Sequence, residues 1–114
     1  DEPMLMALTK KFEKEGFGVT GAKNGEEALA HCLKEHPDLI LLDIVMPKMD
    51  GMTVMNNLRK DAWGKAVPII ILTNLNMDDK IMKGVSKDEP AYYLMKAEVK
   101  LEDIVQKVRD VLKM

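Results

Sequence analysis

A carboxylate stands at the end of an apolar run in the middle of this 114-residue chain. Residues 39–46 are apolar apart from Asp43, and Pro47 and the pair Asp50-Gly51 follow as turn residues. A short apolar run bounded by turn residues is typical of a strand buried on both faces. An isolated buried charge is costly, so we expect Asp43 at the carboxyl end of that strand, where ligands bind in open α/β sheets. A carboxylate in that crevice suits a divalent cation, a phosphoryl group or both.

Helix-like and strand-like periodicities alternate on both sides of Asp43. Apolar residues at helical spacing predict helices over 3–15, 25–35, 51–60, 78–86 and 101–113. Short apolar runs predict strands over 17–22, 39–43, 67–73 and 91–95. Such alternation predicts an α/β fold with a parallel sheet built from βαβ units.

The pattern D-x-x-M-P-x-M-D-G at residues 43–51 resembles the phosphoacceptor segment of response-regulator receiver domains in two-component signalling. The rest of the chain shares the same plan, with matching segments at 24–29, 37–38, 68–73 and 93–96. The resemblance covers essentially the whole chain. It implies a flavodoxin-like, doubly wound parallel sheet with strand order 2-1-3-4-5, in a single receiver domain over residues 1–114.

By this resemblance, Asp43 accepts a phosphoryl group from a histidine kinase or a phosphotransfer protein. The chemistry fits, because a carboxylate can attack phosphorus in line and form an acyl phosphate. The resemblance also implies Mg²⁺, held by the carboxylates of Asp1 and Asp43 and by the backbone carbonyl of Val45. Mg²⁺ takes oxygen ligands of this kind. The chain would assist only its own phosphorylation and dephosphorylation, so we do not expect an enzyme with a separate substrate.

Three residues of the later strands complete the site that the resemblance implies. Thr73 is the switch hydroxyl, which donates to a phosphoryl oxygen. Lys96 pairs with Asp43 and then with the phosphoryl oxygens. Tyr93 is the aromatic residue coupled to Thr73. Their rearrangement would switch a partner-binding surface on the fourth helix, fifth strand and fifth helix, and a homodimer through that face stays open.

The chain also departs from the receiver pattern. It opens on Asp1-Glu2-Pro3, which resembles the segment after the first strand, so strand 1 and its acidic residue are absent from the sequence. We expect the natural protein to carry about five more residues upstream, a usual strand length, apolar and ending in Asp or Glu. Without them, backbone groups of two neighbouring strands lack partners. Asn74 replaces a usually small residue, and Ala97 replaces a proline, so we expect a trans peptide bond there.

Composition limits the partners and the cellular location that we expect for the protein. The formal net charge is −2 with both signs interspersed, which gives no basic field for nucleic acid. No apolar run approaches the length of a membrane-spanning helix, and no signal-peptide pattern opens the chain. Cys32 is the single cysteine and cannot form an internal disulfide, which fits the cytoplasm.

Three other functions are alternatives to a phosphorylated receiver. A pseudo-receiver, a constitutive protein-interaction module, is favoured by Asn74, Ala97 and the missing acid. The presence of Asp43, Thr73 and Lys96 argues against it. An Asp-nucleophile phosphatase would carry a second Asp at the position of Val45. A flavin site would need a Ser/Thr-rich phosphate loop after a strand, which the sequence lacks. The cognate kinase and the output are not encoded in any motif.

Overall fold

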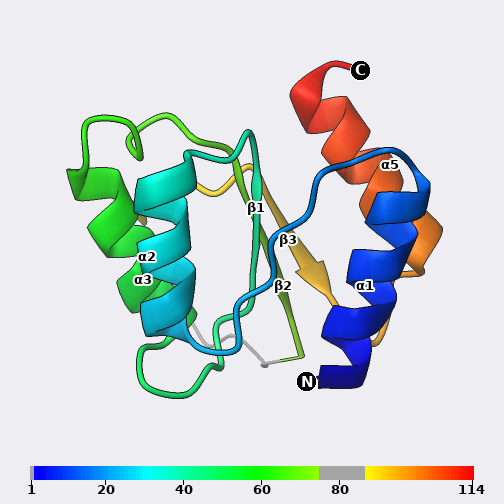
Figure 1. Cartoon of the computed structure of the whole chain (residues 1–114), viewed down its shortest axis with the longest axis horizontal. Coiled ribbons are helices and arrows are strands. Elements are labelled where there is room, and N and C mark those ends of the chain that lie inside the picture. Colours follow the sequence, from blue (N-terminus) through cyan, green and yellow to red (C-terminus); the bar gives the residue numbers. More distant parts are fainter. Residues whose placement is uncertain (1, 75–86) are drawn as a thin grey trace.

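The computed structural model describes residues 2–74 and 87–114. The helices are α1 (Glu2–Lys14), α2 (Gly25–Glu35), α3 (Gly51–Lys60) and α5 (Leu101–Leu112) (Figure 1). The strands are β1 (Ile40–Leu42), β2 (Ile69–Thr73) and β3 (Tyr92–Met95). These bounds confirm four predicted helices and three predicted strands to within two residues at each end. The predicted helix over 78–86 lies outside the described residues, as does Asp1.

The strands form a three-stranded parallel sheet in the order β1-β2-β3. Ile40 lies opposite Ile69, and Thr73 lies opposite Met95. These are the segments expected as the third, fourth and fifth strands, and they are adjacent as that order requires. The positions of the first two strands in the order stay predictions.

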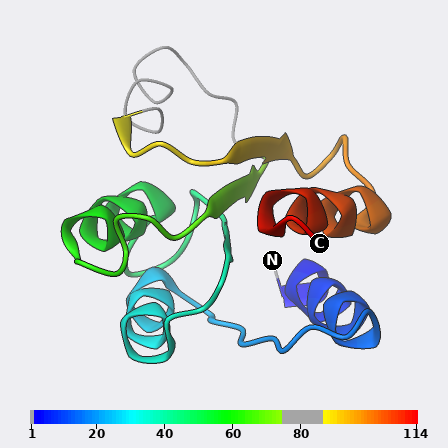
Figure 2. The ribbon, with the colours of Figure 1, turned by 90° about the horizontal axis from the view of Figure 1, so that it is seen from above.

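Helices cover both faces of the sheet, with α2 and α3 on one face and α1 and α5 on the other (Figure 2). All five residues of β2 are buried, because the strand has a helical layer on each side. This explains its continuous apolar sequence. The core beneath α2 and α3 includes Val54, Met55, Leu58, Ile69 and Ile71. The core beneath α1 and α5 includes Phe12, Ile70, Leu72, Ile104, Val105 and Val108.

The predicted strand over 17–22 is wrong. That segment has no regular secondary structure and connects α1 to α2 (Figure 1). Its apolar residues Phe17 and Val19 still pack against the core beneath α1 and α5, which accounts for the alternating pattern in the sequence. A strand also needs a hydrogen-bonding neighbour. Across the described residues, the sheet contains only β1, β2 and β3, so the segment has no strand to pair with.

An aromatic contact joins the end of α2 to the loop that follows α3. His36, the left-handed residue that ends α2, stacks on Trp63 with ring centroids 4.5 Å apart and an interplanar angle of 11°. Trp63 also packs against the core beneath α2 and α3. Trp63 therefore covers the edge of that core.

Among the helices that the structure describes, none has the length and apolar character needed to cross a membrane.

Candidate functional site

Three polar side chains meet at the edge formed by the carboxyl ends of the strands. Asp43 directly follows β1, Thr73 is the last residue of β2, and Lys96 directly follows β3. The Lys96 ammonium donates to Asp43 Oδ2 over 2.5 Å, and the Thr73 hydroxyl also hydrogen-bonds the Asp43 carboxylate. Thr73 is 1% exposed, and the side chains of Lys96 and Asp43 are 13% and 22% exposed. The cluster is therefore sheltered but reachable from solvent at the carboxylate.

Two backbone N–H groups also hydrogen-bond residues of this cluster. The Lys96 N–H donates to the Thr73 carbonyl over 3.0 Å and extends the pairing of β3 with β2 by one residue. The Val45 N–H donates to Asp43 Oδ1 over 3.1 Å. Each carboxylate oxygen of Asp43 thus has at least one donor. Carboxylate oxygens carry two lone pairs each, so acceptor capacity remains for a metal ion or an incoming group.

Two glycines fix the loop after Asp43. A Cβ on Gly51 would lie 2.0 Å from the Asp43 carbonyl oxygen, and the Gly51 N–H donates to the Ile44 carbonyl over 2.8 Å. A Cβ on Gly25 would lie 1.8 Å from the Met49 carbonyl oxygen. The backbone in the first turns of α3 and α2 is therefore in direct contact with the backbone of the loop. Asp50 caps α3 by accepting from the Thr53 N–H over 2.9 Å.

Sequence reasoning missed these close contacts. The pattern marks Gly51 only as a turn residue and Gly25 only as part of a helix start. The available signal was a glycine at the first position of each helix, because glycine is a poor helix former and its presence there calls for another reason.

Opposing effects set the charge state of Asp43. Partial burial is the largest influence on its pKa and acts to raise it. Hydrogen bonds from Lys96, Thr73 and the Val45 N–H, together with the positive charge of Lys96, act in the opposite direction. Their sum holds the pKa of Asp43 below its ordinary value. Asp43 is therefore a carboxylate at neutral pH, the form needed for nucleophilic attack or for metal binding.

Tyr93 bonds a methionine that is paired with Thr73 in the sheet. The Tyr93 hydroxyl donates to Met95 Sδ over 3.1 Å, and Met95 is the register partner of Thr73. Burial raises the pKa of Tyr93, with a smaller contribution from the nearby charge of Glu98. Tyr92 points to the opposite face of β3, and its ring centroid lies 4.6 Å from Lys107 Nζ. The predicted coupling of Tyr93 to Thr73 stays a prediction.

The predicted magnesium ligands are only partly placed. Asp1 lies outside the described residues, and Val45 stands two residues after Asp43 and is 65% exposed. Within the described ranges there is no group of three or more His, Cys, Asp or Glu residues that could hold a metal ion. The ionised Asp43 carboxylate nevertheless fits Mg²⁺, which often takes only one or two protein carboxylates beside water and phosphate oxygens.

Known proteins share this arrangement of sequence and fold. A family model described as the response regulator receiver domain matches residues 1–109. PilH of Pseudomonas aeruginosa is 41% identical over 83 residues, which cover 71% of this chain and 69% of PilH. Other curated relatives are longer, and the matched region spans between 16% and 46% of several of them.

Solved structures agree with this assignment. The receiver domain of the Francisella response regulator 1452 has a TM-score of 0.85 and 29% identity, covering 99% of this chain and 90% of that domain. The CheX–CheY–BeF3–Mg²⁺ complex of Borrelia burgdorferi has a TM-score of 0.83 and 28% identity, covering 98% of this chain and 83% of the matched chain. The chain therefore belongs to the response regulator receiver domain family.

Proposed function

We propose that this receiver domain accepts a phosphoryl group on Asp43 from a histidine kinase or a phosphotransfer protein. The observation that carries the proposal is the cluster at the ends of three adjacent strands, in which Lys96 Nζ lies 2.5 Å from Asp43 Oδ2 and Thr73 bonds the same carboxylate. A nucleophile, a cation and a hydroxyl donor are the parts that such a transfer needs.

The transfer itself uses the ionised form of Asp43. One carboxylate oxygen forms a bond to phosphorus while the bond between phosphorus and the donor's leaving group breaks, and the leaving group keeps the electron pair. Because the pKa of Asp43 is lowered, no proton has to leave the carboxylate first. Lys96 then offers its ammonium to the negative charge on the phosphoryl oxygens.

Receiver domains generally bind Mg²⁺, and one structural neighbour is a complex with BeF3 and Mg²⁺. We propose that Asp43, the Val45 carbonyl and Asp1 would hold the ion in this chain. The ion would supply positive charge to the phosphoryl oxygens.

The switch would begin at Thr73. A phosphoryl group adds a charge of about −1.5 to −2 at neutral pH, close to the buried Thr73 hydroxyl. The hydroxyl would turn from the carboxylate to a phosphoryl oxygen, and Met95 and Tyr93 would adjust with it. We propose that this changes the face of β3 and α5 that partners contact, and a homodimer through that face stays a prediction.

We further propose a cytoplasmic protein that acts through protein partners, with neither nucleic acid nor a membrane bound directly, and with no separate substrate. The pseudo-receiver alternative is not supported by the family match or by the similarity to PilH.

The proposal is tested by intact mass after incubation with Mg²⁺ and a small phosphodonor such as acetyl phosphate. We expect a gain of one phosphoryl group that is lost in Asp43→Asn. The matched control is Asp50→Asn, the same change in the same loop, in which Asn can still cap α3 and the gain should persist. Absence of any gain in the unmodified chain, or an equal gain in Asp43→Asn, would refute the proposal.

A further inference from the structure

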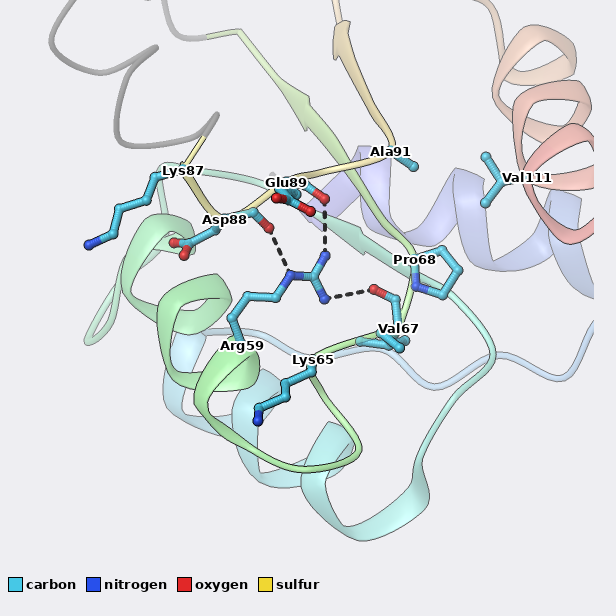
Figure 3. Close-up of a pocket in the computed structure, with 10 residues that line it drawn as sticks. Arg59, Lys65, Val67, Pro68, Lys87, Asp88, Glu89, Ala91 and Val111 are labelled. Carbon is cyan, nitrogen blue, oxygen red and sulfur yellow. Dashed lines mark hydrogen bonds between the residues drawn. The ribbon is translucent and has the colours of Figure 1, made fainter.

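Arg59, in the last turn of α3, joins two loops at the amino ends of the strands. Its guanidinium donates to the carbonyls of Asp88 (2.7 Å), Val67 (2.8 Å) and Glu89 (3.3 Å) (Figure 3). It also donates to the carbonyl of Gly64 over 2.7 Å. Gly64 and Val67 lie in the loop before β2, and Asp88 and Glu89 lie just before β3. One side chain therefore ties together the starting points of two neighbouring strands.

The arrangement depends on the shape of the guanidinium. Arginine presents its N–H donors in a rigid planar fork, whereas lysine offers a single ammonium. Arg59 uses Nε, Nη1 and Nη2 to reach carbonyls in different directions. Burial lowers the pKa of Arg59, with Asp88 and Glu89 acting in the opposite direction.

The segment that Arg59 holds is strained. Glu89 has a φ of 51°, in the left-handed region that non-glycine residues seldom adopt. Pro90 follows, and a residue before proline is pushed towards extended backbone. The local preference of Glu89 is therefore opposed to the conformation it has. Arg59 bonds the carbonyls of Asp88 and Glu89, which belong to the two peptide planes on either side of the Glu89 Cα.

The strained segment leads directly into β3. The Ala91 N–H donates to the Ile69 carbonyl over 2.8 Å and begins the pairing of β3 with β2. The same ladder ends where the Lys96 N–H meets the Thr73 carbonyl. β3 is only four residues long, and its first residue, Tyr92, is exposed. Its register therefore depends on where it starts, and a slip of one residue would exchange its two faces.

We propose that Arg59 is a positioning residue for the site at the other end of the sheet. By holding Glu89 in its strained conformation, Arg59 fixes the start of β3 and so the register that brings Lys96 to Asp43. The consequence for phosphorylation rests on the function proposed above, whereas the effect on the backbone does not.

The backbone effect is tested by amide hydrogen exchange of the unphosphorylated chain, followed by NMR. In Arg59→Gln we expect exchange at Ala91 to rise about 10- to 100-fold, the range implied by loss of hydrogen bonds to a charged group. Exchange at Ile104, in α5, should not change. Lys60→Gln, which removes a neighbouring exposed charge, should leave both amides unchanged. An equal rise at Ala91 and Ile104 would show general destabilisation and overturn the proposal, as would no change at Ala91.

A second substitution tests whether Glu89 is what Arg59 holds. Glycine adopts positive φ without strain, so Glu89→Gly should recover part of the Ala91 protection that Arg59→Gln loses. No recovery would contradict the proposed role of the strained segment.

The link to the site is tested by the initial rate of phosphorylation with a small phosphodonor. We expect Arg59→Gln to be slower than the unmodified chain, with partial recovery in Arg59→Gln/Glu89→Gly and no effect of Lys60→Gln. An unchanged rate in Arg59→Gln, with faster exchange at Ala91, would overturn the positioning of Lys96. An unmodified chain that gains no phosphoryl group would instead overturn the proposed function, while the exchange data still decide the backbone claim.

Discussion

Lys96 Nζ lies 2.5 Å from Asp43 Oδ2, although the two residues are 53 positions apart in the chain. They follow β3 and β1, which are not neighbours, because β2 lies between them. The lysine side chain therefore reaches across the end of β2, where Thr73 stands. The contact exists only when all three strands are in register.

Lys96→Ala should destabilise the domain by about 1–3 kcal/mol at neutral pH, the cost of leaving a partly buried charged group without its partner. The loss of Lys96 should also raise the pKa of Asp43, because burial then acts against fewer stabilising contacts. Urea denaturation and NMR titration of the carboxyl carbon measure the two effects. Lys23→Ala, at an exposed lysine, is the control and should change neither. A Lys96→Ala variant with unaltered stability would mean that the ion pair contributes nothing net.

The stability of the domain should depend on Asp43 at acid pH. A carboxyl whose pKa is lowered by folding adds stability that is present above the pKa of the unfolded chain and is lost as the pH falls through the folded pKa. The unfolding free energy should therefore drop in that acid range. Asp43→Asn should lack this component, so the difference between the two pH profiles isolates it. Parallel profiles for the two proteins would contradict the lowered pKa.

Gly51→Ala should destabilise the domain by about 1–3 kcal/mol or more, the usual effect of inserting atoms into a packed region. The new Cβ would lie 2.0 Å from the Asp43 carbonyl oxygen, so the loop must move. Chemical shifts of Asp43 and Lys96 should change as well. The matched control is Gly18→Ala, because a Cβ there meets nothing within 4 Å. Similar stabilities for both variants would argue against the close approach of α3.

Leu58→Ala should cost about 2–5 kcal/mol, the range for truncating a fully buried leucine. Leu58 is 0% exposed in the core beneath α2 and α3. Leu33, on α2, is 40% exposed, and Leu33→Ala should cost far less. Thermal or urea unfolding of both variants checks the difference, and comparable losses would contradict the assigned core.

The sequence predicted the fold where local pattern and tertiary structure agree. β2 is a continuous apolar run because it is buried on both faces, and the placement of Asp43, Thr73 and Lys96 at strand ends follows from a parallel sheet. Residues 17–22 show the limit of local pattern. Their alternation correctly marks Phe17 and Val19 as core contacts, but strand formation depends on a neighbour that no local pattern encodes.

The contacts that sequence reasoning missed join a side chain to backbone far away in the sequence. Arg59 carries a charge on the last turn of an amphipathic helix, a pattern typical of a solvated residue. Its four carbonyl partners lie in two loops, and those of Asp88 and Glu89 are 29 and 30 residues away. The carbonyls that approach Gly25 and Gly51 are likewise set by how helices pack on a loop. Hydrophobic periodicity carries no information about such contacts.

The stack of His36 on Trp63 determines which structural changes the intrinsic fluorescence of this protein can report. Trp63 is the single tryptophan of the chain. Trp63 lies before β2, whereas Asp43 lies at the opposite edge of the sheet, where the strands end. The indole and the carboxylate are therefore separated by the length of β2, about 16 Å at 3.3 Å per residue. Intrinsic fluorescence should therefore report the separation of α2 from the loop after α3 during unfolding. Magnesium binding or phosphorylation at Asp43 should leave the emission nearly unchanged, so those events require a dye or an isotope label placed at the other edge.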